Sequence, residues 1–343
     1  MKYFSIIMLV FFLLMSIFPS DIEVKLVRSI GESENNNFFM VSGITVSKDK
    51  SIYVVNSREN SISKYNWMGE FIKKIGQKGQ GPGDFNSPHG IDYYKKNIYV
   101  FDSRNHRVVI LDENLVLKKI LNLKSLFNFK VIDKGLFLGN IISSGEKNNA
   151  GLIKVINEDN KIVKTFFNEI KFPENPKKKS AKSFSKIIKL ASLVIGINKE
   201  KNKILVTKMF PNNPADFYIY STEGAFLNKF QYHLDKRYKS PMYKTQNSNS
   251  KNGQSYYYRI NFIFIHRNYI LVCINSRISK DDDEKRERIL IIFNKSGKFI
   301  GKKVIPRKFG SQFFYLTDDT HLLGVALEDE EYKLTILKIE IPN

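Results

Sequence analysis

Two stretches of the chain repeat one another at a fixed spacing of 46 residues. Upstream, Ile52-Tyr53-Val54 precedes Asn56-Ser57-Arg58, and downstream, Ile98-Tyr99-Val100 precedes Asp102-Ser103-Arg104. A period of this length is typical of proteins that stack copies of one supersecondary unit, such as β-propellers and solenoids. The repeat constrains the fold strongly, because each unit must bury its apolar faces against its neighbours.

Short apolar runs separated by turn residues recur along the whole chain and predict β-strands. Five units of four predicted strands are followed by one unit of three. The units span residues 43–75, 90–121, 129–167, 193–230, 261–305 and, for the three-stranded unit, 313–339.

The last unit lacks an outer strand, and the segment before the first unit offers one. Glu23–Ile30 ends at Gly31 and resembles Glu70–Gly76, which closes the first unit. If this N-terminal strand completes the last unit, the ring has no open ends. We therefore predict an all-β fold in residues 21–343, a six-bladed β-propeller with four-stranded blades, closed by an N-terminal strand that completes the last blade.

One stretch also resembles a known repeat. The sequence GQKGQGPGDFNSPHGIDYYKKNIYVFDSRNHRVVILD, beginning at Gly76, is similar to an NHL repeat of the six-bladed β-propeller class. The matching positions are Gly79, Gly81, Gly83, Phe85, Pro88, Gly90-Ile91, Tyr99-Val100, Asp102 and Asn105-His106-Arg107. The resemblance covers roughly one and a half blades and implies the propeller fold. It does not by itself imply a function.

The spaced glycines of this stretch could cradle a phosphate or shape the backbone. A phosphate loop needs Gly-Lys-Ser/Thr or Gly-x-Gly-x-x-Gly before a helix, and neither pattern occurs here. We predict instead that the glycines allow positive φ and close approach of neighbouring blades. Asn56 and Asp102 begin hairpins, where their side chains are expected to accept hydrogen bonds from turn amides.

Four residues near these hairpins are candidates for ligand binding: Arg58, His89, Arg104 and His106. The resemblance to propellers implies that hairpins between second and third strands share a face with the loops that join blades. The four side chains would then lie together around the channel mouth, where propellers bind ligands. The alternative is a solvated turn, with Arg107 capping the following strand.

A net charge of +21, from 55 Lys and Arg against 34 Asp and Glu, is typical of proteins that bind anionic partners. For the charge as a whole we favour the alternative, a Lys- and Asn-rich composition spread over a solvated surface. Basic residues gather in two long insertions, 171–189 and 235–259, and the second also contains tyrosines. Basic and aromatic residues together can bind glycans or single-stranded nucleic acid. The alternative is a polar insertion without a partner, since 245–254 is rich in Asn and Ser. A short helix is predicted over 180–192.

The pattern of the N-terminal residues predicts that the protein is exported from the cytoplasm. One lysine precedes an uncharged run from Tyr3 to Ser20, which is typical of a secretory signal. Phe18 stands where a cleavage site needs a small residue, so residues 1–20 could equally remain as a signal anchor. In both cases the propeller is expected outside the cytoplasm, in the periplasm, secreted or anchored by this segment.

Catalytic and metal-binding motifs are absent from the sequence. The acidic run 281–284 lacks the spaced ligands and glycine of a calcium loop. The five histidines show no His-x-His or His-Glu-x-x-His spacing, and Gly-x-Ser-x-Gly does not occur. The single cysteine, Cys273, lies in an apolar run and is predicted to be a buried strand residue.

These observations favour a monomeric recognition scaffold that uses no cofactor, metal or catalytic residue. Its partner would be a protein or an anionic glycan bound through one basic face, with nucleic acid a less favoured partner. The alternative is a propeller enzyme, a metal-assisted lyase or lactonase-type hydrolase, with its site at the central channel. A channel mouth lined by His, Asp and Glu would favour the enzyme, and one lined by Lys, Arg, Tyr and Asn would favour the scaffold.

Overall fold

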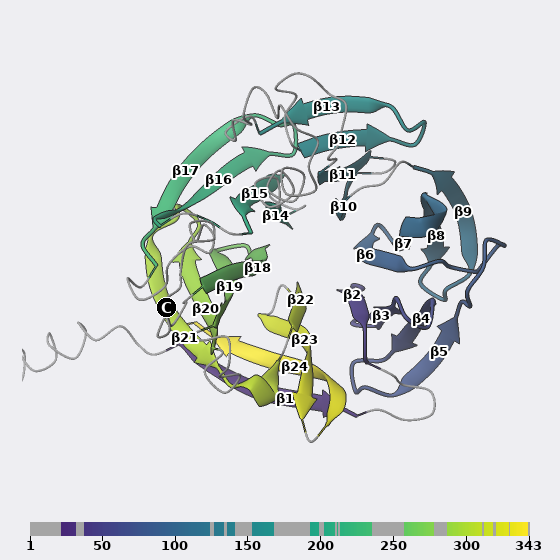
Figure 1. Cartoon of the computed structure of the whole chain (residues 1–343), viewed down its shortest axis with the longest axis horizontal. Helices are drawn as coiled ribbons and strands as arrows, with labels where there is room; N and C mark the ends of the chain where they lie inside the picture. Colours follow the sequence, from purple (N-terminus) through teal and green to yellow (C-terminus); the bar gives the residue numbers. More distant parts are fainter. Residues whose placement is uncertain are drawn as a thin grey trace, which may run out of the picture.

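The computed structural model describes residues 22–31, 38–123, 127–133, 136–140, 153–167, 193–198, 202–209, 211, 213–234, 257–277, 287–310, 312–317, 320–328 and 330–341. These residues form six four-stranded antiparallel sheets, arranged as blades around a common centre (Figure 1). The predicted all-β, six-bladed propeller is therefore confirmed. No helix in the described part is long and apolar enough to cross a membrane.

The strands of each blade follow one another from the centre outward (Figure 1). Blade one contains β2 (Val41–Val46), β3 (Ile52–Asn56), β4 (Ser61–Tyr65) and β5 (Phe71–Ile75), and blade two contains β6 (Pro88–Tyr94), β7 (Asn97–Asp102), β8 (Arg107–Asp112) and β9 (Leu117–Asn122). Blade three contains β10 (Phe127–Asp133), β11 (Leu136–Asn140), β12 (Ile153–Asn157) and β13 (Ile162–Phe166), and blade four contains β14 (Leu193–Asn198), β15 (Lys203–Lys208), β16 (Ala215–Ser221) and β17 (Phe226–Tyr232). Blade five contains β18 (Tyr257–Ile265), β19 (Tyr269–Arg277), β20 (Glu287–Asn294) and β21 (Phe299–Ile305).

Blade six joins the two ends of the chain. Its order is β1-β24-β23-β22, with β22 (Gln312–Leu316), β23 (His321–Glu328), β24 (Glu331–Glu340) and β1 (Glu23–Ile30). The two end strands pair antiparallel from Glu23 opposite Glu340 to Ile30 opposite Leu334. The N-terminal strand therefore occupies the vacant outer position, as the sequence predicted.

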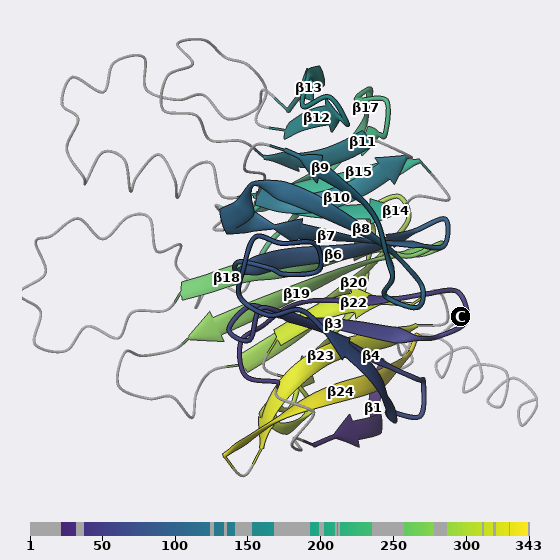
Figure 2. The ribbon, with the colours of Figure 1, turned by 90° about the vertical axis from the view of Figure 1, so that its right-hand side faces the viewer.

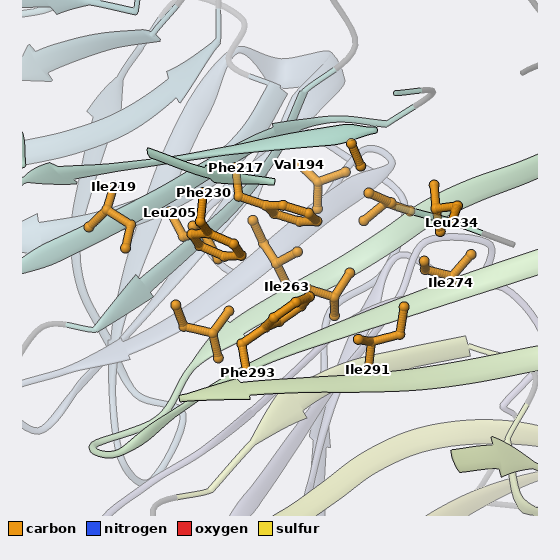
Figure 3. Packing of buried hydrophobic residues seen from close by; sticks show 14 residues of the cluster. Val194, Leu205, Phe217, Ile219, Phe230, Leu234, Ile263, Ile274, Ile291 and Phe293 are labelled. Carbon is orange, nitrogen blue, oxygen red and sulfur yellow. The ribbon is translucent and has the colours of Figure 1, made fainter. Parts of the chain in front are cut away.

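The core is divided among the junctions between blades. Each of the six buried apolar clusters draws its side chains from two neighbouring blades. In β3, Tyr53 and Val55 pack toward blade two, while Ile52 and Val54 pack toward blade six. This division follows from the alternation of side chains along a strand. Figure 3 shows the junction of blades four and five, where Phe217, Phe230 and Phe293 pack together.

The antiparallel order gives the ring two different faces. We call one face the upper face: it carries the hairpins between second and third strands and the loops that join blades. The lower face carries the hairpins between first and second strands and between third and fourth strands. Figure 2 shows the ring from its edge, with the upper face on the left, to which β19 points, and the lower face on the right.

One predicted boundary is wrong. Residues 257–259 were expected within the insertion that ends at Arg259, but they begin β18, because β19 extends to Arg277 and supplies pairing partners for them. The N-terminal run 1–20, the insertion 171–189, the predicted helix 180–192, residues 235–256 and the acidic run 281–284 lie outside the described residues.

Candidate anion-binding pocket

An open pocket of about 490 Å³ lies on the upper face, at the junction of blades one and two. It is lined by Phe39, Met40, Ser57, Arg58, Asn60, Lys78, Asn86, Ser87 and Arg104. Two of the four predicted site residues, Arg58 and Arg104, therefore meet in one pocket. The other seven lining residues were not predicted as site residues. Ser57 and Asn60 belong to the hairpin that carries Arg58. The remaining five come from the loops before β2 and β6, whose folding the strand pattern does not specify: Phe39, Met40, Lys78, Asn86 and Ser87.

Arg58 and Arg104 occupy equivalent positions in the two repeats, 46 residues apart. Arg58 follows Asn56, whose side-chain carbonyl accepts hydrogen bonds from the backbone amides of Arg58 and Glu59, both at 3.1 Å. This is the turn bonding that the sequence predicted for Asn56. The Arg58 guanidinium lies 5.0 Å from the centre of the Phe39 ring, so the pocket combines a cation with an apolar wall.

Arg104 is positioned by hydrogen bonds between its hairpin and the loop before β6. Its backbone amide donates to the Asn86 carbonyl at 3.2 Å, and the Ser103 hydroxyl donates to the Ser87 carbonyl at 2.6 Å. Ser87 in turn donates its amide to the Asn60 side-chain carbonyl at 2.7 Å, which links the two blades beneath the pocket. The Arg104 side chain itself is exposed.

The pocket has an excess of positive charge. Among the described residues, no carboxylate forms an ion pair with Arg58, Lys78 or Arg104. The nearby acids have other partners: Glu59 lies 2.6 Å from Lys74, and Asp102 lies 2.8 Å from Arg107. Three cations and several amide and hydroxyl groups therefore face solvent without a neutralising anion.

A buried ion pair holds the loop that forms one side of the pocket. Arg107 donates to the Asp102 carboxylate at 2.8 Å and to the carbonyls of Gln80, Gly81 and Asp84 at 2.8, 3.1 and 2.8 Å. Asp102 also accepts from the Asn86 amide at 2.7 Å.

This arrangement differs from the expected roles of both residues. Asp102 was predicted to accept hydrogen bonds from the amides of its own turn, and in the solvated-turn alternative Arg107 was expected to cap the following strand. The glycine-rich loop folds back over the hairpin instead, which buries both side chains. Sequence reasoning missed this pair, because burial of Arg107 depends on a loop that arrives from more than twenty residues upstream.

The glycines of this loop have two different roles. Gly83 has a φ of +85°, as predicted, whereas Gly79 and Gly81 are not in the left-handed region. At these two positions a Cβ atom would collide with the Asp84 side chain, whose carboxylate accepts a hydrogen bond from the Gly81 amide at 3.1 Å. Gly79 and Gly81 are therefore needed for space, and only Gly83 for backbone conformation.

Gly76, where the loop begins, combines both constraints. Its φ is +97°, and an added Cβ would lie 2.6 Å from the Asn60 carbonyl oxygen. We expect Gly76→Ala to lower the free energy of unfolding by about 2–3 kcal/mol, through backbone strain and this contact. Gly31→Ala is the matched control, because nothing lies within 4 Å of its added Cβ. Urea unfolding of both variants measures the difference, and equal midpoints would contradict the structural role of Gly76.

His89 and His106 are not among the residues that line the pocket. His89 lies near the start of β6, where its side chain is exposed, and desolvation by the surrounding protein lowers the pKa of its imidazole below the ordinary value. His106 is exposed at the end of the hairpin, with a φ of +50°.

The described lining of the pocket contains no histidine or carboxylate. No group of three or more His, Cys, Asp and Glu side chains that could hold a metal ion occurs within the described residues. Cys273 is buried in β19, which raises the pKa of its thiol to about 12. The pocket can therefore supply an anion with positive charge and with hydrogen bonds donated by amide and hydroxyl groups.

Comparison with known proteins agrees with the fold. Residues 32–190 match the DUF5128 family, which is described as a 6-bladed beta-propeller. The match spans less than half of the 343-residue chain. It supports a six-bladed propeller family, whereas the NHL-repeat label stays a prediction. No curated protein matches this chain.

Several solved structures share the architecture. A DUF4221 family member from Bacteroides vulgatus has 12% sequence identity and a TM-score of 0.63, covering 94% of this chain and 100% of its own. A candidate exported protein from Bacteroides fragilis has 15% identity and a TM-score of 0.63, covering 95% and 97%. A luciferin-regenerating enzyme has 11% identity and a TM-score of 0.51, covering 93% and 95%. At these identities the similarity shows the fold alone.

Proposed function

We propose that this protein is an extracytoplasmic binding scaffold that recognises an anionic group of a protein or glycan at the pocket between blades one and two. The observation that carries the proposal is the pair Arg58 and Arg104, placed with Lys78 in one pocket without a described carboxylate partner. An unneutralised cluster of cations attracts an anionic ligand and favours its binding.

The chemistry of the pocket fits an oxyanion. Arginine presents a planar set of donors that matches carboxylate, sulfate and phosphate groups, often through two parallel hydrogen bonds. The amides of Asn60 and Asn86 can donate to a sugar or peptide beside that group. Phe39 and Met40 add an apolar wall, so the ligand is expected to carry an apolar part next to its charge.

The surroundings make the pocket rigid. Asn60, Asn86 and Ser87 are held by hydrogen bonds across the blade junction, and Arg107 holds the loop that carries Lys78. A preformed site loses less conformational entropy when it binds. A rigid pocket favours specific recognition of one ligand over general attraction of anions to a flexible charged surface.

The cellular location belongs to the same proposal. The uncharged run that ends at Ser20 supports export, and a structurally similar protein is described as a candidate exported protein. The enzyme alternative required converging His, Asp or Glu side chains at the channel mouth. The described pocket residues, with their Arg, Lys, Asn and Ser side chains, support binding instead.

The proposal predicts that pocket charge matters more than total charge. In the full-length protein, Arg58→Gln combined with Arg104→Gln is expected to weaken binding of a sulfated heparin tetrasaccharide or a polyglutamate peptide about tenfold, through lost charge-assisted hydrogen bonds. The measurement is titration calorimetry at low and at physiological salt.

The matched control is Lys95→Gln combined with Lys96→Gln. It removes the same two charges from an exposed hairpin on the lower face. The control is expected to retain binding to within about twofold, since distant exposed charges are largely screened. If both double variants lose affinity equally, binding is diffuse and the pocket proposal is wrong.

A further inference from the structure

A β-bulge recurs at the same place in five of the six blades. In blade one, Tyr65 is opposite Phe71 and Lys64 is opposite Lys73, so Ile72 has no partner in the neighbouring strand. The residues that correspond to Ile72 in the following blades are Lys118, Val163, Leu227 and Ile300. A bulge at a repeated position re-aims one side chain in each blade.

In three blades the bulged residue is aliphatic and points into solvent. The exposed fractions of Ile72, Val163 and Leu227 are 50%, 50% and 49%. In blades one and four the residue before the bulge has a role in packing, since Phe71 lies 5.9 Å from the Tyr65 ring and Phe226 lies 5.7 Å from the Tyr220 ring. Ile72, Val163 and Leu227 appear in none of the buried clusters or their partly buried neighbours, whereas the bulged Ile300 of blade five packs against a buried cluster.

These residues share one location. Each lies near the start of an outer strand, which follows a hairpin between third and fourth strands and so begins at the lower face. We call this set, with the exposed residues that precede them, the lower rim: Phe71, Ile72, Ile162, Val163, Phe226 and Leu227. Edge strands ordinarily carry charges or proline at exposed positions, so aliphatic residues there call for a partner.

The chain also enters the ring at this rim. β1 is an outer strand, and like the others it begins at the lower face. Ile22, just before it, is only 4% exposed and packs in the cluster with Leu290 and Leu337. The point at which the uncharged N-terminal run joins the propeller is therefore fixed at the lower face.

We propose that the lower rim rests on a lipid bilayer surface. The uncharged run from Tyr3 to Ser20 ends two residues before Ile22, which lies at the lower face, so a bilayer that held this run would lie near the rim. Lysines follow the rim residues in β5, β13 and β17, namely Lys73, Lys164 and Lys229. Their ammonium groups contact the Asn114 carbonyl, Glu223 and Asp216 respectively. The proposal therefore rests on the aliphatic side chains of the rim, which would enter the bilayer interface. The anion-binding pocket would then face away from the bilayer. This inference is independent of what the pocket binds.

Single-cysteine reporters test the proposal in the full-length chain. Cys273 is 5% exposed and has a raised pKa, so a maleimide dye reacts with an introduced cysteine instead. Val163→Cys reports on the rim, and Gln77→Cys, in the loop after β5, reports on the upper face. Both proteins are reconstituted into phosphatidylcholine–phosphatidylglycerol vesicles that contain nitroxide-labelled lipid. Quenching is expected at position 163 and not at position 77.

Two further double variants distinguish contact between the rim and the bilayer from anchoring through the N-terminal run alone. In the Val163→Cys protein, Ile72→Ser with Leu227→Ser is expected to abolish most of the quenching. Val304→Ser with Leu327→Ser, which removes exposed aliphatic side chains near the upper ends of β21 and β23, is expected to leave quenching unchanged. Equal quenching at positions 163 and 77, no quenching at either, or insensitivity to the rim substitutions would each overturn the proposal. Thermal melts establish that all variants remain folded.

Discussion

Arg107→Leu is expected to lower the free energy of unfolding by about 3–5 kcal/mol, because it removes one partner of a buried ion pair. The substitution leaves the Asp102 carboxylate fully buried, with only the amides of Asn86 and Asn105 as donors. It also leaves three loop carbonyls without the donors that Arg107 supplies. Buried polar groups without partners are costly, so the whole glycine-rich loop should loosen.

Arg104→Leu is the matched control for this prediction. It lies three residues earlier in the same hairpin, but its side chain is exposed and has no described ion pair. Its effect on stability is expected to stay within about 0.5 kcal/mol. Urea unfolding followed by tryptophan fluorescence measures both variants, since Trp67 is the single tryptophan. Similar midpoints for Arg107→Leu and the parent protein would show that the loop is held by other contacts.

The two arginines divide the hairpin between stability and recognition. Arg107→Leu should also weaken anion binding, because the loop it holds carries Lys78 and positions Asn86 and Ser87. Arg104→Leu should weaken binding without unfolding the pocket. Measuring both properties on both variants therefore separates a residue that contacts the ligand from one that positions the site.

The fold was predictable from sequence because its physical causes are local and repeated. Continuous apolar runs such as Ile52–Asn56 are buried on both faces of the strand, so each must pack against two neighbouring sheets, as in an array of stacked or ringed units. The likeness of Glu23–Ile30 to Glu70–Gly76 was enough to assign the closing strand. The pocket was predictable only in part: the repeat identified Arg58 and Arg104, but nothing local places Lys78 or Asn86 beside them.

Other features could be predicted only with knowledge of the register, which is the pairing of residues between neighbouring strands. The apolar pairs at Phe71-Ile72 and Phe226-Leu227 are visible in the sequence, yet their meaning depends on which residue is bulged out. Register is set by turns and by the pattern of the partner strand, so a slip of one residue exchanges the buried and exposed side chains. The start of β18 was misplaced for a similar reason, since the extra residues of its partner β19 extend the pairing.

The largest effect is expected from removing the closing strand. A chain that begins at residue 32 lacks β1, its antiparallel pairing with β24 and the buried side chain of Ile22. Blade six then exposes the edge of β24, whose Leu334 and Ile336 pack at the junction with blade one and whose Leu337 packs at the junction with blade five. We expect a loss of more than about 5 kcal/mol, beyond the range of ordinary point substitutions, with aggregation through the new edge.

A chain that begins at residue 21 is the necessary control, because both truncations remove the apolar N-terminal run but only one removes β1. It is expected to melt cooperatively at the temperature of the full-length protein, whereas the shorter chain should melt far lower or precipitate. Ile22→Asp in the full-length protein gives an intermediate case, since it places a charge among Leu290, Ile305 and Leu337 while leaving the strand pairing available. Calorimetric melts rank the three proteins. If the chain from residue 32 melts like the chain from residue 21, five complete blades and a three-stranded sixth are sufficient, and the ring does not depend on its closing strand.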